Sequence, residues 1–384
     1  KGYFINFVAL DTKNKMSINS ISLKNFKSIR EVTGISFGAI NVLIGANGSG
    51  KSNLISFFKL LNKIMNRDLQ IYISTGGGAN RYLYFGQKKS DFLEGEIVLH
   101  NEEESFSSKV KYSFKLLLSQ HGGFSFEEDK VSYVIENNDW LEVEKNSPFK
   151  GYFESNIPDN INSRNAYVIN FLENIRTFHF NDTTSTALLK GFSDVNDDRY
   201  LKEDAKNLAA FLYKLRKTHP KHYNIIEKTI QSVAPFFNRF DLKPTPGSPP
   251  VINLKWLEKG SDDYFDAHYL SDGTLRFICL TTLLLQPDPP ATIIIDEPEL
   301  GLHPSAIDKL AAMIQSASVK TQIIVSTQSI ELLNNFSADD VIVVEKKDNQ
   351  SVFKRLDAES LKDWLEDYTL GELWYKNVIG GKPQ

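Results

Sequence analysis

Residues 45–52 read "GANGSGKS" and match the phosphate-binding pattern G-x-x-x-x-G-K-[ST] at every position. The apolar run "INVLIG" leads into them and a helical pattern begins near Lys51, which is the strand–loop–helix setting in which this pattern cradles phosphates. Glycines let backbone N–H groups turn inward, Lys51 would neutralise the β- and γ-phosphates of ATP, and Ser52 would ligate Mg²⁺. We therefore expect ATP and Mg²⁺ as ligands, with further contacts from the loop residues Asn47, Gly48, Ser49 and Gly50.

A second candidate stretch, "TIIIDEPE" at 292–299, ends an apolar strand with two carboxylates. Ligands of open α/β sheets bind at the carboxyl ends of the strands, so Asp296 is placed to hold Mg²⁺. Glu297 is placed to orient and deprotonate an attacking water. On its own this pair also fits two solvated carboxylates at a strand end, and its pairing with residues 45–52 favours the catalytic interpretation.

A third stretch, "YLSDGTLRF" at 269–277, is a polar turn that opens a helix. A hydroxyl at a helix N-terminus can bind an anion, which makes Ser271 and Gly273 candidate nucleotide contacts. The alternative is an ordinary N-cap, with Ser271 or Asp272 capping a helix of the core.

The elements around these stretches predict an α/β fold. From residue 272 onward helices and strands alternate, which is typical of a parallel sheet flanked by helices. Period-two patterns indicate an antiparallel region, and one long stretch is mostly helical, with Pro220 opening a helix. We expect a single domain at 17–384, built from core halves at about 17–90 and 251–384, an inserted β region at about 91–150 and a helical subdomain at about 160–240. Within the second half we expect helices at 304–316 and 329–336, and strands at 251–257, 291–296, 322–327 and 340–346.

Composition limits the classes of protein that fit. The chain is 41% hydrophobic and 24% charged, as in globular domains, and its net charge of −4 gives no overall attraction to nucleic acid or acidic membranes. The single cysteine, Cys279, excludes an internal disulfide framework and is expected to be an inert core thiol in a cytoplasmic protein. The apolar runs are too short to span a bilayer, so no membrane association is expected.

The three stretches, in this order and separation, resemble the ABC-type ATPases of the SMC/RecF/OLD branch. "SISLKNFKSIREV" (20–32) is similar to the first strands of those heads, "YLSDGTLRF" to their signature motif, and "DEPELGLHP" (296–304) to their Walker B segment. Within the branch, the tail "DYTLGELWYKNVIGGKP" (367–383) and "NLAAFLYKLRKTHPKHYNII" (207–226) resemble short members without a coiled coil. The resemblance implies a P-loop NTPase head that dimerises head-to-tail. It also implies that each ATP lies between residues 45–52 of one copy and residues 271–274 of the other.

Several positions depart from the pattern of that branch. Gln328, in "IIVSTQSIEL", stands where a histidine is usual, and its amide could still donate to a phosphate oxygen or to the attacking water. Asp272 replaces a glycine and brings a carboxylate near an anion. For the glutamine of the usual Q-loop, Gln87 is only a weak candidate, and His303 is expected to be a structural turn residue.

The function expected from the sequence is an ATP-hydrolysing switch. The resemblance points to DNA maintenance or defence against foreign DNA, with DNA and a separate nuclease or other effector as partners and a homodimer or higher homo-oligomer as the working form. A nucleotide-gated scaffold with little hydrolysis and, less favoured, a transporter ATPase subunit stay as alternatives. The basic residues Lys214, Arg216, Lys217 and Lys221 either contact a phosphate backbone or form a solvated helix face, and the second interpretation is favoured.

Overall fold

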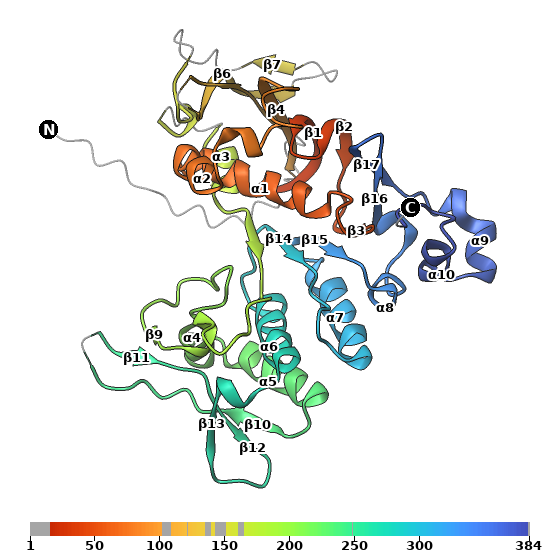
Figure 1. Cartoon of the computed structure of the whole chain (residues 1–384). Helices are drawn as coiled ribbons and strands as arrows, with labels where there is room; N and C mark the ends of the chain where they lie inside the picture. The colour runs from red at the N-terminus through yellow and green to blue at the C-terminus, as the bar shows by residue number, and fades with distance from the viewer. Residues whose placement is uncertain are drawn as a thin grey trace, which may run out of the picture.

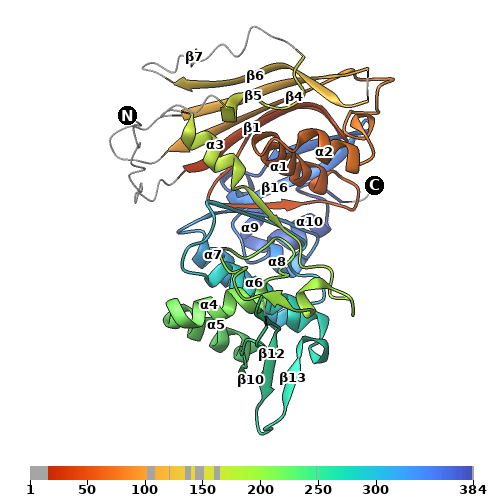
Figure 2. The same ribbon diagram turned by 90° about the vertical axis from the view of Figure 1, so that its left-hand side faces the viewer.

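Two sheets and two helical layers are stacked in the computed structural model, which describes residues 16–101, 109–120, 122–134, 140–142, 151–159, 165–247 and 249–382. An antiparallel sheet lies at one end, a helical layer separates it from a mostly parallel sheet, and further helices cover the other face of that sheet (Figures 1 and 2). Some neighbouring strands within each large sheet come from parts of the chain that are far apart in the sequence.

The mostly parallel sheet is the core that carries the candidate site. Its strand order is β17-β16-β3-β15-β14-β8, with β17 antiparallel to β16 and the other neighbours parallel. The strands are β3 (Ile40–Ile44), β8 (Arg176–Phe178), β14 (Thr292–Asp296), β15 (Gln322–Thr327), β16 (Val341–Lys347) and β17 (Gln350–Arg355). The expected strands at 291–296, 322–327 and 340–346 are confirmed. Strand β8 lies inside the stretch expected to be helical and was not predicted, because three residues are too few to show a period.

The antiparallel sheet has the order β2-β1-β4-β5-β6-β7. Its strands are β1 (Met16–Phe26), β2 (Ile29–Ser36), β4 (Phe92–Asn101), β5 (Lys109–Leu118), β6 (Phe124–Val134) and β7 (Trp140–Glu142). The predicted antiparallel region is confirmed at β4, β5 and β6, while its parts at 102–108, 135–139 and 143–150 lie outside the described residues. Because β1 pairs with β4 over most of its length, this region and the strands β1 and β2 form one sheet.

Helix α1 (Lys51–Met65) begins where the sequence predicts and lies between the two sheets (Figure 2). The sequence shows one apolar stripe, but the helix buries side chains around most of its circumference. Both of its flanks face apolar sheet surfaces, and such a helix needs apolar residues on each. The buried residues are Leu54, Ile55, Phe57, Phe58, Leu60, Leu61, Ile64 and Met65. The helices α2 (Leu69–Thr75) and α3 (Ala166–Glu173) complete this layer.

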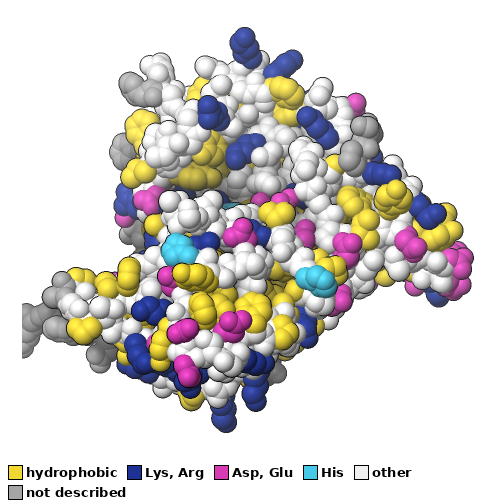
Figure 3. Space-filling view, turned by 60° about the horizontal axis from the view of Figure 1, so that its bottom comes forward, with side chains coloured by type: hydrophobic (Ala, Val, Ile, Leu, Met, Phe, Trp, Pro, Cys, Tyr) yellow, Lys and Arg dark blue, Asp and Glu magenta, His cyan; other side chains and the backbone are white. Residues whose placement is uncertain are grey.

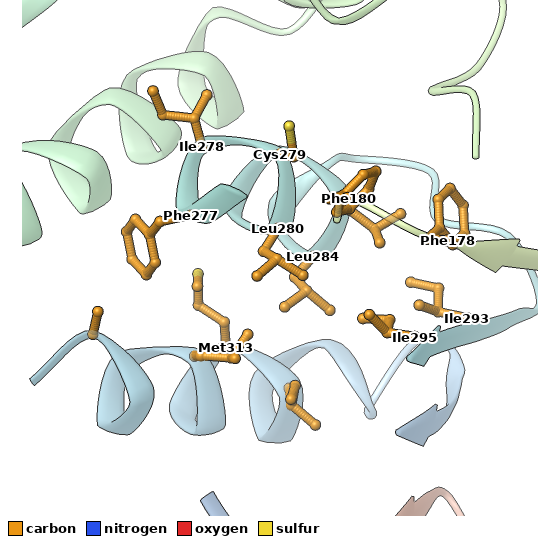
Figure 4. Close-up of a cluster of buried hydrophobic side chains, with 14 of the residues drawn as sticks. Phe178, Phe180, Phe277, Ile278, Cys279, Leu280, Leu284, Ile293, Ile295 and Met313 are labelled. Carbon is orange, nitrogen blue, oxygen red and sulfur yellow. The ribbon is translucent and has the colours of Figure 1, made fainter. Parts of the chain in front are cut away.

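Strand alternation divides the core into two clusters. Ile294, Ile324 and Ile342 face α1, whereas Ile293, Ile295 and Ile323 face the opposite helices. On that opposite side α6 (Asp272–Leu285), α7 (Pro304–Ala317) and α8 (Ile330–Leu333) pack on the sheet, with α4 (Leu208–Thr218) and α5 (Pro220–Val233) beyond them. Figure 4 shows α6 side chains such as Leu280 and Leu284 meeting Ile293 and Ile295 from β14. Pro220 is the first residue of α5, as expected, and α8 is shorter than the predicted 329–336.

Cys279 lies fully buried in this second cluster (Figure 4). Burial raises the pKa of its thiol to about 12, so the thiolate is not formed near neutral pH. The interpretation of Cys279 as an inert core thiol is consistent with this environment.

The small sheets and the C-terminal helices lie beyond the two six-stranded sheets, and several of their side chains, such as Phe237, Trp256 and Leu373, belong to the second cluster. One prediction is wrong here: the expected strand at 251–257 is two short strands in different sheets, because β11 pairs with β9 and β12 pairs with β10 and β13. The remaining elements are β9 (Ser193–Asp194), β10 (Phe237–Phe240), β11 (Val251–Ile252), β12 (Lys255–Glu258), β13 (Tyr264–Asp266), α9 (Lys362–Asp367) and α10 (Leu370–Tyr375). Within the described part of the chain, no helix has the length and apolar character to cross a bilayer.

Candidate functional site

The loop at 45–52 joins β3 to α1 at the carboxyl edge of the parallel sheet, where the sequence analysis places the phosphates. Gly50 is the N-cap of α1 with φ +119°, a conformation that side chains with a Cβ rarely adopt. A Cβ at Gly50 would lie 2.1 Å from the Ser351 hydroxyl, and one at Gly45 would lie 2.2 Å from the Val344 carbonyl oxygen. Packing therefore requires glycine at both positions, and at Gly50 the backbone conformation requires it as well.

Segments from the end of the chain support this loop, and the sequence analysis assigned them no such role. The Gly381 carbonyl accepts a hydrogen bond from the Ala46 N–H at 2.9 Å. The Gly381 N–H in turn donates to Glu345 Oε1 of β16 at 2.7 Å. From β17, the Ser351 hydroxyl donates to the Ser49 carbonyl at 2.6 Å. The tail returns to the core sheet (Figure 1) and fixes the loop from outside.

Lys51 is folded back onto its own loop. Its side chain is almost fully buried, and Nζ donates to the carbonyls of Gly45 at 2.6 Å and Ala46 at 3.1 Å. Burial lowers the pKa of this ammonium group, while the negative charges of Glu297 and Asp296 act in the opposite direction. The ammonium is thus held among carbonyls and carboxylates, where a phosphate group would be a strong partner for it.

Asp296 ends β14 and faces the first turn of α1. Its Oδ2 accepts a hydrogen bond from the Ser52 hydroxyl at 3.3 Å, and its Oδ1 accepts one from Ser326 on the neighbouring strand β15. A hydroxyl and a carboxylate in contact are oxygen ligands of the kind Mg²⁺ prefers, with the rest of its shell usually supplied by phosphate and water. The two residues predicted to hold Mg²⁺ therefore lie together and fit that ion.

Glu297 and Gln328 meet at the centre of the site. Gln328 Nε2 donates to Glu297 Oε1 at 2.6 Å and to Asn47 Oδ1 at 2.6 Å. Its amide therefore joins the carboxylate after β14 to the loop before α1. The backbone of Glu297 has φ +48°, which is uncommon for a residue with a side chain, and its N–H donates to the Ser326 carbonyl at 2.9 Å. Such local strain is typical of functional sites, where the surrounding structure holds it in place.

Glu299 is a buried carboxylate that the sequence analysis did not single out. Its Oε1 accepts hydrogen bonds from the Thr327 hydroxyl at 2.5 Å and from the Gln328 N–H at 3.3 Å, while Oε2 is buried and has no hydrogen-bond partner among the described residues. Burial raises the pKa of this group, and its hydrogen bonds oppose the rise. Glu299 therefore fixes the turn that carries Gln328.

His179 and Lys59 also border the site and were missed. Phe178 of β8 pairs with Ile295 of β14, so the following residues, His179 and Asp296, lie at the same level of the sheet edge. Lys59, on α1, contacts His179 Nε2 through its ammonium group. Burial lowers the pKa of both groups. Only the pairing of a three-residue strand reveals this placement.

Ser271 and Gly273 form a separate feature. Ser271 is the N-cap of α6 and accepts a hydrogen bond from the Thr274 N–H at 3.2 Å, so the capping interpretation holds. Gly273 packs against the loop after β14, where a Cβ would lie 2.3 Å from the Gly301 carbonyl oxygen. Among the described residues, the hydrogen bonds of these two residues do not reach the loop at 45–52 of the same chain.

Other residues weighed from the sequence have structural partners. Gln87 is exposed, and its N–H donates to Asn80 Oδ1 at 2.7 Å, which fits a surface loop. His303 is the N-cap of α7, where its Nδ1 accepts from the Ser305 N–H at 3.3 Å. His303 is thus a turn residue, as expected.

The basic residues of α4 are largely engaged within the chain. Lys214 pairs with Asp198 at 3.6 Å, Arg216 donates to the Leu242 carbonyl at 2.8 Å, and Lys217 lies 4.0 Å from the centre of the Tyr213 ring. Figure 3 shows one face of the molecule, on which Lys and Arg side chains are interspersed with Asp and Glu. These contacts favour a solvated helix face over a phosphate-binding patch.

The fold and the site together define a P-loop ATPase of the ABC type, in the branch that contains SMC and OLD proteins. The family model described as "AAA domain, putative AbiEii toxin, Type IV TA system" matches residues 40–334, which is more than half of the chain, and the chain belongs to this family. The match spans the loop at 45–52, the signature-like turn and the segment at 296–304.

Individual relatives are distant. The chain is 23% identical over 378 residues to the Old nuclease of Escherichia phage P2, covering 90% of this chain and 62% of that protein. It is 26% identical over 230 residues to the structural maintenance of chromosomes protein 3 homolog of Plasmodium falciparum, covering 59% of this chain and 17% of the relative. The chain thus spans less than two thirds of the length of either relative.

Solved structures show the same fold. A Smc head bound to the C-winged helix domain of ScpA superposes with a TM-score of 0.60 at 19% identity, covering 90% of this chain and 99% of that one. A Smc head with an extended coiled coil, bound to the C-terminal domain of ScpA derived from Pyrococcus furiosus, gives a TM-score of 0.55 at 17% identity, covering 92% and 99%. At these identities the likeness establishes the fold alone.

Proposed function

We propose that this chain binds ATP with Mg²⁺ and hydrolyses it, using Glu297 to orient and deprotonate the attacking water and Gln328 to position Glu297 and the water. The observation that carries the proposal is the Gln328 amide, which bridges Asn47 and Glu297 at 2.6 Å each. The loop residues Asn47, Gly48, Ser49, Gly50 and Lys51 would bind the phosphates, and Ser52 and Asp296 would hold Mg²⁺.

Gln328 replaces the usual histidine without removing hydrogen bonding from the site. An amide N–H₂ donates as an imidazole N–H does, although it carries no positive charge. Its contact with Glu297 favours an active site over a scaffold that binds nucleotide without hydrolysis. The scaffold stays as the second candidate, and turnover decides between them.

The switch would work through a homodimer. Ser271 and Gly273 lie at the N-terminus of α6, and among the described residues neither hydrogen-bonds to the chain's own loop at 45–52, which supports their contact with ATP held by a second copy. ATP binding would close two copies around two nucleotides, and hydrolysis would release them. This arrangement is supported by the fold shared with Smc heads.

The process served by the switch is proposed from its relatives. One relative is the phage P2 Old nuclease and another is an SMC protein, which supports work on DNA in maintenance or defence, with a separate effector such as a nuclease. The Smc heads in the solved structures are bound to ScpA domains, which supports docking of a second protein on this fold. A cytoplasmic setting is supported by the single, buried cysteine.

The test compares two variants. Glu297→Gln keeps the shape of the side chain and removes the base, so it should bind ATP–Mg²⁺ and lose turnover by about a hundredfold or more. Lys51→Ala should weaken ATP binding itself. Steady-state phosphate release and equilibrium binding of a fluorescent ATP analogue measure the two effects, and Lys362→Ala, which changes an exposed lysine of α9, is the control. Turnover of Glu297→Gln at the parent rate would remove Glu297 from its proposed role.

Assembly is tested in the Glu297→Gln variant, in which ATP is retained. Light scattering should show the mass of a dimer with ATP and that of a monomer without it. Ser271→Arg should block the shift, since a bulky side chain would occupy the place of the second copy's nucleotide. A mass that does not depend on ATP in any variant argues against the dimer model.

A further inference from the structure

A nearly buried lysine lies beside the turn at 271–274. Lys190 ends the short helix Leu188–Lys190, its side chain is 7% exposed, and its Nζ donates to the Thr183 carbonyl at 2.6 Å. The same Nζ lies 3.9 Å from Oδ1 of Asp272, whose side chain is 69% exposed. Asp272 therefore faces solvent on one side and a fixed positive charge on the other.

The segment that carries Lys190 is anchored to the same helix as Asp272. Arg276, one turn further along α6, donates through Nε to the Phe180 carbonyl at 3.0 Å and through its terminal amino group to the Asn181 carbonyl at 3.4 Å. One end of this segment is therefore bonded to α6, and the Lys190 ammonium is bonded to the backbone of the same segment at Thr183, which places it next to Asp272. The contact between Lys190 and Asp272 is thus part of the folded structure around the turn at 271–274.

In the free chain Asp272 gains little from Lys190. An exposed carboxylate is well hydrated, and an ion pair at 3.9 Å near solvent contributes little to stability. Burying a lysine side chain also costs desolvation energy, which the hydrogen bond to Thr183 only partly offsets. Folding alone thus gives no strong reason for a buried ammonium group at this place.

Closure of two copies would change the electrostatic environment of Asp272. Water would leave the turn at 271–274, and the Asp272 carboxylate would then stand near the terminal phosphate of ATP held by the second copy. Like charges repel strongly once water is excluded, since the effective dielectric constant falls. A cation already fixed behind the carboxylate makes the turn close to neutral before the anion arrives.

We propose that Lys190 is a positioning residue of the nucleotide sandwich, which neutralises Asp272 so that the turn at 271–274 accepts the terminal phosphate of ATP bound to a second copy of this chain. The inference rests on the proposed dimerising function and adds to it the residue that makes an acidic turn compatible with a phosphate.

The experiment measures, in the Glu297→Gln background, the ATP concentration that gives half-maximal dimer by light scattering. Lys190→Met removes the charge and keeps the length of the side chain, and Lys190→Arg keeps the charge. Asp272→Asn is combined with Lys190→Met in a double variant. Lys206→Met is the matched control, because Lys206 forms a lysine–aspartate pair of the same length, 3.9 Å, with Asp204.

Lys190→Met should raise the half-maximal ATP concentration at least tenfold, while Lys190→Arg and the control stay within about threefold of the parent. Adding Asp272→Asn to Lys190→Met should restore dimerisation to within about threefold, since it removes the carboxylate that has lost the Lys190 charge. The contact with Thr183 is lost in both Met variants, so a purely structural role of Lys190 cannot produce this rescue. Binding of a fluorescent ATP analogue to the monomer should be unchanged.

Two results overturn the inference. If Lys190→Met dimerises like the parent, Lys190 has no role in the sandwich although the dimer stands. If the double variant is as impaired as Lys190→Met alone, the lysine acts through folding of its segment and not through Asp272. Absence of any ATP-dependent dimer in the parent background would overturn the proposed dimer and this inference together, and so is distinguishable from the first two results.

Discussion

Removing the Gln328 side chain tests the central contact of the site. Its Nε2 forms two hydrogen bonds of 2.6 Å, one to the Glu297 carboxylate and one to Asn47. Ser329, not Gln328, is the N-cap of α8, and it accepts from the Leu332 N–H. Gln328→Ala therefore removes contacts with the proposed base and the phosphate loop and leaves the helix cap intact.

The expected magnitude follows from the bond to Glu297. A hydrogen bond to a charged group contributes about 1.5–3 kcal/mol. If this contribution holds Glu297 in the orientation needed in the transition state, its loss lowers kcat by about ten- to a hundredfold, at about 1.4 kcal/mol for each factor of ten. The bond to Asn47 is neutral and adds at most a smaller effect on ATP affinity. We expect kcat to fall much more than affinity.

Steady-state ATPase assays and equilibrium binding of an ATP analogue separate the two effects. Gln328→His should keep part of the activity, because an imidazole N–H can donate in place of the amide. Gln315→Ala is a matched control, since Gln315 also donates one side-chain hydrogen bond, to the Asn335 carbonyl at 2.7 Å, but lies on α7 outside the site. Melting temperatures report folding. A kcat of Gln328→Ala within about twofold of the parent would refute the reasoning.

Three further predictions follow from the geometry. Gly50→Ala should lower ATP affinity more than about tenfold, because its Cβ would lie 2.1 Å from Ser351 Oγ at φ +119°, and calorimetric titration with ATP checks this. Gly273→Ala should leave ATP binding by the monomer intact and weaken ATP-dependent dimerisation, since its Cβ would meet the Gly301 carbonyl at 2.3 Å and displace the turn; equal loss of both would contradict the assignment. Burial raises the pKa of Glu299 above its ordinary value of 4.5, so the native chain binds more protons there than the unfolded chain. The free energy of unfolding therefore falls as the pH rises from the ordinary pKa through the raised one. Glu299→Gln should therefore melt at a higher temperature than the parent by a margin that widens as the pH rises above 4.5 through the raised pKa, and a margin independent of pH would show that the pKa of Glu299 is not shifted.

Local sequence was sufficient to predict those parts of the site whose residues are contiguous in the chain. The loop at 45–52 has its glycines, lysine and serine within eight residues, and its conformation depends on positive φ values that only glycine tolerates well. Apolar runs such as 292–296 predict buried strands without knowledge of their neighbours. For the same reason α1 and α7 could be placed from the sequence, since period and capping are properties of short segments.

Strand order could not be obtained from any segment alone. Gln328, Glu297 and Asn47 meet because β15 lies between β3 and β14, which brings three carboxyl ends to one edge. The three-residue strand β8 is too short for a periodic signal, and only its pairing with β14 brings His179 to the level of Asp296. Burial of Glu299 likewise depends on the packing of β15 against the loop that follows β14.

The sequence by itself determined that the chain has a phosphate-binding loop, a strand ending in two carboxylates and a capped helix at 271–274, because each is encoded within a few neighbouring residues. Tertiary structure alone decided which distant groups meet: the Gly381 backbone and the Ser351 hydroxyl bond to the phosphate loop, and Lys190 lies beside Asp272. These contacts join residues tens to hundreds of positions apart. Their formation depends on the summed burial of two hydrophobic clusters and on the pairing order of the strands, which no local pattern records.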